Sequence, residues 1–372
     1  MSTFYMPVPV FEEQDAVRNH AADFKQFGNK ALIVTGRSSA KKNGAYDDVA
    51  SALDSQGISH VLFDEVEENP SIETVMKARD LGVSEQVEFV VGIGGGSPLD
   101  AAKAISLMIR HADKDVSYLY SPDGGSEALP VAAVPTTCGT GSEVTPVSVL
   151  TNTPKGIKKS IPHRLFPQLA LIDGKYLRSA PEKVIACTAF DALTHLVESE
   201  LNSKMTPYSH MCTDAGLKTW ALSLPVLRGE KTPGDEDYMN MMRASMMAGM
   251  SIAHTSTTLP HGLSYPLTYK LGVPHGKATA YFTAGYLDEA PAERREYLLH
   301  TAGFSSLVDF RSVFRRTCGP VEVEETALIS VLNDAVAETA SNPVKMALAA
   351  FKVDKAVLER IAFYELSDPL GD

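Results

Sequence analysis

The chain has 372 residues, of which 44% are hydrophobic and 22% charged, and its formal net charge at pH 7 is −12. This length predicts two domains, and the composition is that of a globular protein with a sizeable core. The negative balance, without a basic cluster, argues against nucleic acid or an anionic membrane surface as a main partner. The four cysteines show no framework spacing, and we find neither a secretion signal nor an apolar run of membrane-spanning length. We therefore expect a cytoplasmic protein.

The first half of the chain alternates short apolar runs with helical patterns. Strands are predicted at residues 31–34, 60–63, 89–93, 131–134 and 169–172, and helices at 46–56, 71–83 and 98–110. This alternation is typical of a mainly parallel sheet that helices cover on both faces. Residues 4–10 are expected to form an extended edge segment.

The alternation stops near residue 177, and helical periodicity dominates the rest of the chain. Helices are predicted at residues 239–252, 292–302, 305–317, 324–340 and 354–365. The prolines at 260, 266 and 274 predict that His261 lies on a helix and His275 on a loop beyond it. We predict an α/β domain over residues 1–178 and an all-helical domain over residues 179–372.

A glycine-rich turn follows the predicted strand at 89–93. Its sequence is Gly-Gly-Gly-Ser-Pro, with Ser97 suited to cap a helix and Pro98 to be its first residue. Glycines let a backbone approach a phosphate closely, and a helix N-terminus attracts an anion. The sequence therefore predicts a phosphate site here, while a tight turn without a ligand is the alternative.

A second loop, at residues 135–146, follows the next strand and is rich in hydroxyl groups and glycines. Open α/β sheets bind ligands at the carboxyl ends of their strands. Taken alone, this loop is equally compatible with a capped loop that binds nothing. Together with the glycine turn it predicts the other wall of a nucleotide site.

Asp191 and His195 are four residues apart, so both side chains lie on one face of a predicted helix. With His261 and His275 they form a set of one carboxylate and three imidazoles, which suits a divalent metal that keeps a position open for substrate. A lone histidine is more often a core or surface residue, and this interpretation applies to His20, His60, His111, His163, His210 and His300. His254 is left undecided.

These segments together resemble the iron-containing (group III) alcohol dehydrogenase family over essentially the whole chain. The matching pieces are residues 94–103, 135–146, 191–195, 261–266 and 274–276, in the family's order and spacing. The resemblance implies an N-terminal Rossmann-like dinucleotide-binding α/β domain and a C-terminal all-α domain, the dehydroquinate synthase-like architecture. It also implies a metal between the two domains, bound by Asp191, His195, His261 and His275, with the nicotinamide stacked above it.

The resemblance further implies which residues contact the dinucleotide. These are Gly95, Gly96 and Ser97 at the pyrophosphate, Asp100 near the nicotinamide side, and Asn69, Thr136, Thr137, Ser142, Lys158 and Leu177 around the rest of the cofactor.

The chain departs from the common family pattern at Tyr265, where many members have a second histidine near the substrate. A tyrosine with a pKa near 10 can pass a proton but does not become charged near neutral pH. Tyr265 is therefore a candidate catalytic residue, and packing in the pocket wall is the equally weighted alternative.

A second departure concerns the nucleotide. NAD-preferring members commonly place an aspartate after the first strand, where it bonds the ribose 2′-hydroxyl. This chain has Gly36 there, followed by Arg37, Ser38, Ser39 and Lys42. Loss of the carboxylate removes repulsion of a 2′-phosphate, and the following residues supply donors and positive charge. We therefore expect a preference for NADP(H). The alternative is NAD, in which case Arg37 and Lys42 are ordinary solvated surface charges.

The expected activity is reversible oxidation of a small primary alcohol to an aldehyde, with the metal polarising the oxygen. Fe²⁺ is the metal that the family implies, and Zn²⁺ is the alternative because it binds the same ligand types. The alternatives in function are a dehydroquinate-synthase-like lyase, a glycerol-dehydrogenase-like polyol oxidoreductase, and a non-enzymatic protein that has kept the cofactor cleft. A homodimer is expected from the family.

Overall fold

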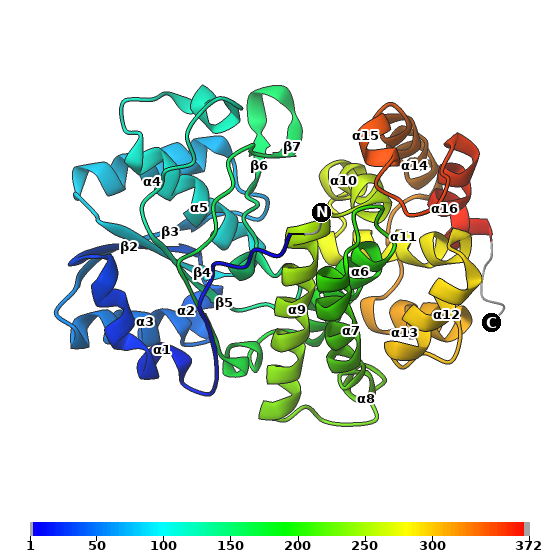
Figure 1. Cartoon of the computed structure of the whole chain (residues 1–372), viewed down its shortest axis with the longest axis horizontal. Coiled ribbons are helices and arrows are strands. Elements are labelled where there is room, and N and C mark those ends of the chain that lie inside the picture. Colours follow the sequence, from blue (N-terminus) through cyan, green and yellow to red (C-terminus); the bar gives the residue numbers. More distant parts are fainter. Residues whose placement is uncertain (1–2, 368–372) are drawn as a thin grey trace. The chain divides into compact units, whose positions relative to one another are not determined.

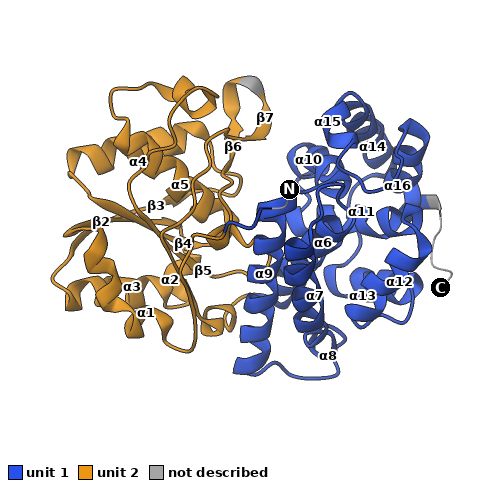
Figure 2. Ribbon diagram, in the orientation of Figure 1, with its two compact units in different colours: residues 1–5, 181–372 blue, residues 6–180 orange. Residues whose placement is uncertain are grey.

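The computed structural model describes residues 3–367 (Figure 1), which divide into two compact units (Figure 2). One unit comprises residues 6–180 and contains the sheet. The other comprises residues 3–5 together with the chain from residue 181 onward, and the regular elements described in it are all helices. No helix among the described residues is both long enough and apolar enough to cross a membrane.

The sheet of the first unit has six strands in the order β1-β8-β5-β4-β2-β3, and every neighbouring pair is parallel. The strands are β1 (Val10–Glu12), β2 (Lys30–Gly36), β3 (Ser59–Val66), β4 (Phe89–Gly94), β5 (Val131–Pro135) and β8 (Leu169–Ile172). The five predicted strands are thus confirmed. The edge strand is β1 rather than residues 4–10, since residues 3–9 have no regular secondary structure.

Helices cover both faces of this sheet. They are α1 (Ala16–Asn19), α2 (Ser39–Lys42), α3 (Ala45–Ser55), α4 (Ile72–Ser84) and α5 (Gly96–Arg110), with short 3-10 helices at Ala21–Phe27, Val116–Tyr120, Ser142–Val144, Thr153–Lys155 and Gly174–Leu177. Helices α1 and α3 lie on one face and α4 and α5 on the other (Figure 1). Side chains alternate along β2, so Ile33 packs with α1 and α3 while Leu32 packs with α4 and α5. Because successive side chains point to opposite faces and helices cover both faces, residues along a central strand are buried on either side, and the central strands are apolar throughout.

A small antiparallel hairpin, β6 (Val149–Asn152) and β7 (Ile157–Ser160), lies outside the main sheet. The sequence did not predict it, because β7 is Ile-Lys-Lys-Ser and is largely exposed. Such a strand carries no apolar pattern from which to identify it.

The strand order reverses direction at β2. The chain goes from β2 to β3 on one side, and then places β4 on the other side of β2 and β5 beyond it. Thr35 of β2 pairs with Ile93 of β4, so the carboxyl ends of these two strands are adjacent. Open α/β sheets bind ligands at such a reversal, and the two ends carry Gly36 and the glycine-rich turn.

The helical unit contains eleven helices among the described residues. They are α6 (Glu182–Glu200), α7 (Pro207–Ala221), α8 (Leu224–Leu227), α9 (Asp235–Thr255), α10 (Leu259–Leu271), α11 (His275–Glu289), α12 (Ala292–Thr301), α13 (Leu307–Cys318), α14 (Glu325–Ala340), α15 (Pro343–Met346) and α16 (Lys355–Ser367). The five helices predicted here are confirmed. Helix α6 is buried along most of its length, as a helix at the centre of a bundle should be.

The expected loop position of His275 is wrong, because His275 is the first residue of α11. Pro274 occupies the N-cap position with an extended ψ of 135°. A proline at this position ends the preceding turn, and the next helix begins at the residue that follows the proline. No additional loop residues separate Pro274 from α11.

A buried ion pair joins α13 to α16. Glu365 accepts hydrogen bonds from Arg311 Nε at 3.0 Å and from Arg315 Nε at 2.8 Å. The Arg311 side chain is 1% exposed, so its charge has no access to water if the carboxylate is removed.

We predict that Glu365→Ala lowers the free energy of unfolding by about 3–5 kcal/mol, because it leaves a buried guanidinium uncompensated. The matched control is Glu359→Ala on the same helix, whose exposed pair with Lys355 is worth at most about 1 kcal/mol. Urea titration followed by helical circular dichroism checks both variants. Equal effects of the two substitutions would contradict the prediction.

Candidate functional site

The glycine-rich turn packs tightly against the loop that follows β5. A Cβ atom on Gly95 would lie 2.9 Å from Thr137 Oγ1, and one on Gly96 would lie 2.8 Å from Thr140 Cγ2. Side chains at these positions would therefore separate the two loops. The glycines bring two backbones together at the carboxyl ends of β4 and β5, the arrangement that a phosphate-binding turn needs.

The helix after this turn begins earlier than predicted. Helix α5 starts at Gly96 with Gly95 as its N-cap, so the expectation that Ser97 caps the helix is wrong. Ser97 Oγ instead accepts a hydrogen bond from the backbone N–H of Asn69 at 3.2 Å. Pro98 remains in the first turn, where its missing N–H costs no helical hydrogen bond.

Three residues that the family resemblance assigns to the cofactor lie together beside this turn. Besides its bond to Ser97, Asn69 accepts a hydrogen bond at Oδ1 from Lys158 Nζ at 2.7 Å. Asn69 has a φ of 57°, a left-handed conformation that asparagine tolerates better than most residues. The structure thus brings Asn69, Ser97 and Lys158 into one cluster. Leu177, by contrast, is buried in the 3-10 helix Gly174–Leu177.

Asp100 fastens the two loops to each other. Its carboxylate accepts hydrogen bonds from Ser142 Oγ at 2.5 Å and from the Val149 N–H at 2.9 Å. The buried Lys103 ammonium donates to Ser142 Oγ at 2.7 Å and to the Val147 carbonyl at 2.8 Å. These contacts occupy Asp100 and Ser142 within the protein, and a direct contact of either side chain with the cofactor stays a prediction. Thr136 continues the same frame, since its N–H donates to the Gly94 carbonyl at 2.9 Å.

The end of β2 is open enough to accept a side chain. The nearest atom to a Cβ on Gly36 would be the Val66 carbonyl oxygen, at an ordinary contact distance of 3.5 Å. Ser38 and Ser39 are exposed at the start of α2. Lys41 is held by Asp64 at 2.5 Å, whereas no ion pair involves the exposed side chains of Arg37 or Lys42 in the described chain.

The helical unit brings three of the four predicted metal ligands together. One ligand atom from each of Asp191, His261 and His275 lies within 4.8 Å of the other two, and the described residues contain no other such group of three or more. They come from three helices: Asp191 from α6, His261 from α10 and His275 from the first turn of α11. Convergence of segments so far apart in the chain is what a metal site requires.

The donor atoms fit a divalent cation. His261 Nε2 is buried, has no hydrogen-bond partner among the described residues, and lies 3.7 Å from Asp191 Oδ1. Two atoms bound to one metal at roughly 2.1 Å each can lie up to about 4.2 Å apart, so this separation accommodates a shared ion. A buried nitrogen lone pair beside a carboxylate is otherwise unfavourable.

The fourth predicted ligand, His195, lies next to this group but outside it. Its ring stacks on that of His261 with centroids 4.5 Å apart. Burial by itself would raise the pKa of Asp191, but the charges of His195, His275 and His261 and a hydrogen bond from Thr279 outweigh it and hold that pKa below its usual value. Asp191 is therefore anionic near neutral pH, as a metal ligand would need to be.

Tyr265 lies one turn after His261 on α10, and its ring is nearly parallel to that of His275, with centroids 6.3 Å apart. The structure thus places it beside the metal-ligand candidates. A role in proton transfer stays a prediction.

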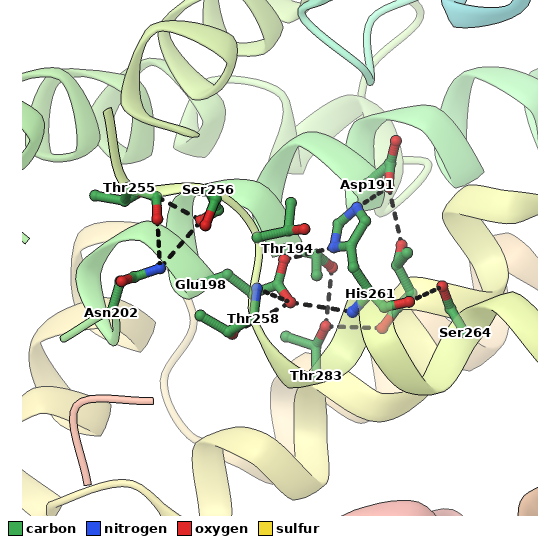
Figure 3. A network of polar contacts seen from close by, with 12 residues as sticks. Asp191, Thr194, Glu198, Asn202, Thr255, Ser256, Thr258, His261, Ser264 and Thr283 are labelled. Atoms are coloured by element: carbon green, nitrogen blue, oxygen red, sulfur yellow. Dashed lines mark hydrogen bonds and ion pairs between the residues drawn. The ribbon is translucent and has the colours of Figure 1, made fainter. Parts of the chain in front are cut away.

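Sequence reasoning missed Glu198, whose carboxylate contacts His261 (Figure 3). His261 Nδ1 donates to Glu198 Oε2 at 2.5 Å, and Oε1 accepts from the His261 N–H at 3.0 Å and from the Thr258 N–H at 3.1 Å. A carboxylate on one ring nitrogen fixes the tautomer and turns the other nitrogen toward a metal. The spacing could have revealed it, because Asp191, His195 and Glu198 follow an i, i+4, i+7 pattern on one helix face.

Glu198 is fully buried and has its own compensating charges. Burial alone would raise its pKa, but the charge and hydrogen bond of His261 and the charge of Lys345 lower that pKa below its usual value. Lys345 in turn donates to the Thr257 carbonyl at 3.0 Å. The carboxylate thus remains charged and available to orient His261.

Most of the other histidines have ordinary structural partners. His254 Nδ1 donates to the Met250 carbonyl at 2.7 Å, its Nε2 accepts from the Tyr5 N–H at 3.1 Å, and its ring stacks on Phe4. This settles the undecided position, since both ring nitrogens are occupied away from the metal-ligand candidates. Polar contacts within the protein are likewise made by His20, His60, His111, His163 and His210.

Comparison with known proteins agrees with this geometry. The chain matches the family described as iron-containing alcohol dehydrogenase over residues 7–174, and the C-terminal family of Fe-containing alcohol dehydrogenases over residues 185–296. A crystal structure of an iron-containing alcohol dehydrogenase from Thermotoga maritima is 36% identical, with a TM-score of 0.89 over 99% of this chain and 100% of that one.

Two curated relatives match over shorter stretches. A long-chain primary alcohol dehydrogenase, AdhA, from Thermoanaerobacter ethanolicus is 32% identical over 67% of this chain and 63% of its own length. An NADPH-dependent butanol dehydrogenase from Clostridium saccharobutylicum is 30% identical over 68% of this chain and 66% of its own.

The chain combines a parallel α/β unit, with a glycine-rich turn at its strand reversal, and a helical unit with an aspartate–histidine cluster. Together with the matches above, this architecture places it in a class of nucleotide- and metal-dependent oxidoreductases. Within that class, the chain belongs to the iron-containing alcohol dehydrogenase family.

We predict that Glu198→Gln weakens metal binding by about 10- to 100-fold, because the amide cannot act as the charged acceptor for His261 Nδ1. Metal-free protein titrated with Co²⁺ and followed by its absorption spectrum gives the dissociation constant. The control is Glu200→Gln on the same helix, since Glu200 is also buried but pairs with Arg294 and His210. Unchanged Co²⁺ affinity in Glu198→Gln would remove the assigned role.

Proposed function

We propose that the protein is a metal-dependent, NADP(H)-linked alcohol dehydrogenase and aldehyde reductase acting on small primary alcohols and aldehydes. The observation that carries this proposal is the buried group of Asp191, His261 and His275, with Glu198 orienting His261. The names of the relatives, all of them enzymes of alcohol oxidation or aldehyde reduction, support the substrate class.

Asp191, His195, His261 and His275 would hold the metal. When bound, a divalent metal supplies Lewis acidity to the substrate oxygen and the nicotinamide supplies hydride chemistry. The protein's own part is to keep Asp191 anionic, to keep His261 Nε2 directed at the ion, and to exclude competing hydrogen bonds by burial. Fe²⁺ is the proposed ion because the family is iron-containing, with Zn²⁺ as the competitor.

Asp191→Ala and His261→Ala are expected to abolish turnover of alcohols while leaving dinucleotide binding intact, because these side chains belong to the helical unit. NADPH fluorescence titration and metal analysis report the two properties separately. His254→Ala is the control, since that histidine packs on Phe4 away from the cluster. Turnover by either metal-stripped variant would refute the proposed metal dependence. Net reduction of free NADP⁺ by an alcohol distinguishes a dehydrogenase from a lyase that uses its nucleotide transiently.

The proposed NADP(H) preference is based on the end of β2. Gly36 brings no charge to this position, and the exposed Arg37 and Lys42 supply positive charge nearby. One relative is named an NADPH-dependent enzyme, which agrees with the proposal.

We expect the wild type to have a higher kcat/KM with NADPH than with NADH. Gly36→Asp should lower the NADPH/NADH ratio by about tenfold or more, which corresponds to about 1.4 kcal/mol of repulsion against the 2′-phosphate. Gly36→Ala tests the effect of bulk alone and should change the ratio little, because a Cβ fits there. A wild type that favours NADH would overturn the assignment.

We also propose a cytoplasmic homodimer. The four cysteines are buried free thiols, as is usual in a reducing compartment. Phe4, Tyr5, Tyr208 and Met211 are exposed on the helical unit, and the rings of Phe4 and Tyr208 lie 5.7 Å apart. An exposed apolar group of this kind is a candidate subunit interface.

A further inference from the structure

A buried threonine contacts the carboxylate of one predicted metal ligand. Thr279 lies on α11, and its hydroxyl donates a hydrogen bond to Asp191 Oδ1 at 2.9 Å. The same carboxylate oxygen lies 3.7 Å from His261 Nε2, the buried ring nitrogen that has no hydrogen-bond partner among the described residues. The Thr279 hydroxyl therefore touches the oxygen of Asp191 that faces a second ligand candidate.

The start of α11 explains how Thr279 reaches this position. His275 is the first residue of the helix and Thr279 lies one turn later, so both side chains project from the same face. Gly276 lets this part of α11 approach α6 closely, because a Cβ on Gly276 would overlap the Cys187 carbonyl and lie 3.0 Å from Asp191 Cβ. A larger residue at this position would separate the helices and the hydroxyl from the carboxylate.

Two other buried threonines between α6 and α11 make ordinary structural contacts. Thr194 Oγ1 lies 2.9 Å from the Phe190 carbonyl, and Thr283 Oγ1 lies 3.1 Å from the Thr279 carbonyl. Both are local contacts with the carbonyl four residues earlier on the same helix, as is common for threonine. The two hydroxyls also lie 2.8 Å apart and belong to the same polar network as Asp191 (Figure 3). Helix packing accounts for both of them.

Thr279 has a local acceptor too, which makes its contact with Asp191 informative. Its Oγ1 lies 3.0 Å from the Gly276 carbonyl, three residues earlier on α11. A hydroxyl has a single hydrogen, and a hydrogen bond to a carboxylate is roughly twice as strong as one between neutral groups. Thr279 therefore directs its hydrogen to Asp191, although the helix itself already offers an acceptor.

The carboxylate of an aspartate does not fix its own orientation. Rotation about the last side-chain bond of aspartate is broad, unlike rotation about the staggered bonds of an aliphatic chain. A hydrogen bond to one of the two oxygens restricts this rotation before any ion is bound. Glu198 has the equivalent effect on His261, whose Nδ1 it accepts at 2.5 Å. Asp191 and His261 are thus each oriented by a separate residue.

We propose that Thr279 is a positioning residue of the metal site, which holds Asp191 Oδ1 toward His261 Nε2. This role rests on the proposed function, in which Asp191 and His261 bind the ion. A ligand that is already oriented loses less conformational freedom on binding, so the hydrogen bond raises the affinity for a divalent metal. Without the Thr279 hydroxyl, the carboxylate is free to rotate and to present its oxygens differently to the ion.

The test measures Co²⁺ binding to the metal-free, full-length protein by absorption spectroscopy. Thr279→Val removes the hydroxyl and keeps the branched shape, and it should weaken Co²⁺ binding by about 10- to 100-fold, as is usual for residues that orient a metal ligand. The absorption bands of bound Co²⁺ should also change, because they depend on the number and arrangement of the ligand atoms. Thr279→Ser restores a hydroxyl and should recover the wild-type spectrum and most of the affinity.

Two further variants separate the hydrogen bond from packing. Thr279→Ala removes the hydroxyl without placing a methyl group beside the carboxylate, and it should show the same loss as Thr279→Val. The matched control is Thr283→Val, one turn later on the same helix, whose equally buried hydroxyl contacts Thr194 and the Thr279 carbonyl. Its Co²⁺ affinity and spectrum should equal those of the wild type. Urea unfolding of the metal-free proteins shows that each variant is folded.

The possible failures of the two proposals are distinguishable. Wild-type affinity and spectrum in Thr279→Val and Thr279→Ala would overturn the role of Thr279 and leave the proposed function intact. An equal loss in Thr283→Val, or no recovery in Thr279→Ser, would also overturn it, because the effect would then come from helix packing. Failure of the wild type to bind Co²⁺ would refute the proposed metal site, and the role of Thr279 with it.

Discussion

The structure of the helical unit depends on compensating two carboxylates that α6 carries into its interior. Asp191 and Glu198 are both buried, and an uncompensated charge in that position would cost several kcal/mol. His261 of α10 lies between them, with Nδ1 on Glu198 and Nε2 facing Asp191. His275 of α11 completes the set around Asp191. The contacts of His261 with these two carboxylates join α6 to α10, and His275 brings α11 to the same group.

In the sheet unit, contacts within the protein hold the glycine-rich turn against the loop that follows β5. Gly95 and Gly96 allow two loops to touch, and Asp100 with Lys103 then fastens them through Ser142 and Val149. The side chains of Asp100, Lys103 and Ser142 are satisfied by protein groups, so the predicted phosphate contact would fall to the backbone of the turn. Preorganisation of this kind reduces the ordering cost of binding.

Much of the secondary structure could be predicted from the sequence, because buried faces give strands and helices a periodic pattern of apolar residues. The central strands and the helices that were predicted lie where the apolar pattern places them, whereas α7 and α11 were not predicted. The apolar pattern does not predict elements that are exposed or whose ends depend on tertiary contacts. The polar strand β7 and the start of α11 at His275 are two examples. Glu198 was missed for a related reason: an acidic residue on a helix is usually solvated, so its spacing from Asp191 and His195 was only a weak signal until its contact with His261 from another helix was seen.

Tyr265 lies beside the group of predicted metal ligands. It follows His261 by one turn of α10, and its ring lies alongside that of His275 rather than among the grouped ligand atoms. An imidazole at this position would add a basic nitrogen beside a group that already contains His261 and His275, and that nitrogen could compete for an ion or titrate near neutral pH. A phenol does neither, because it stays neutral in that range. A tyrosine at this position therefore places a neutral phenol, rather than a titratable imidazole, beside His275.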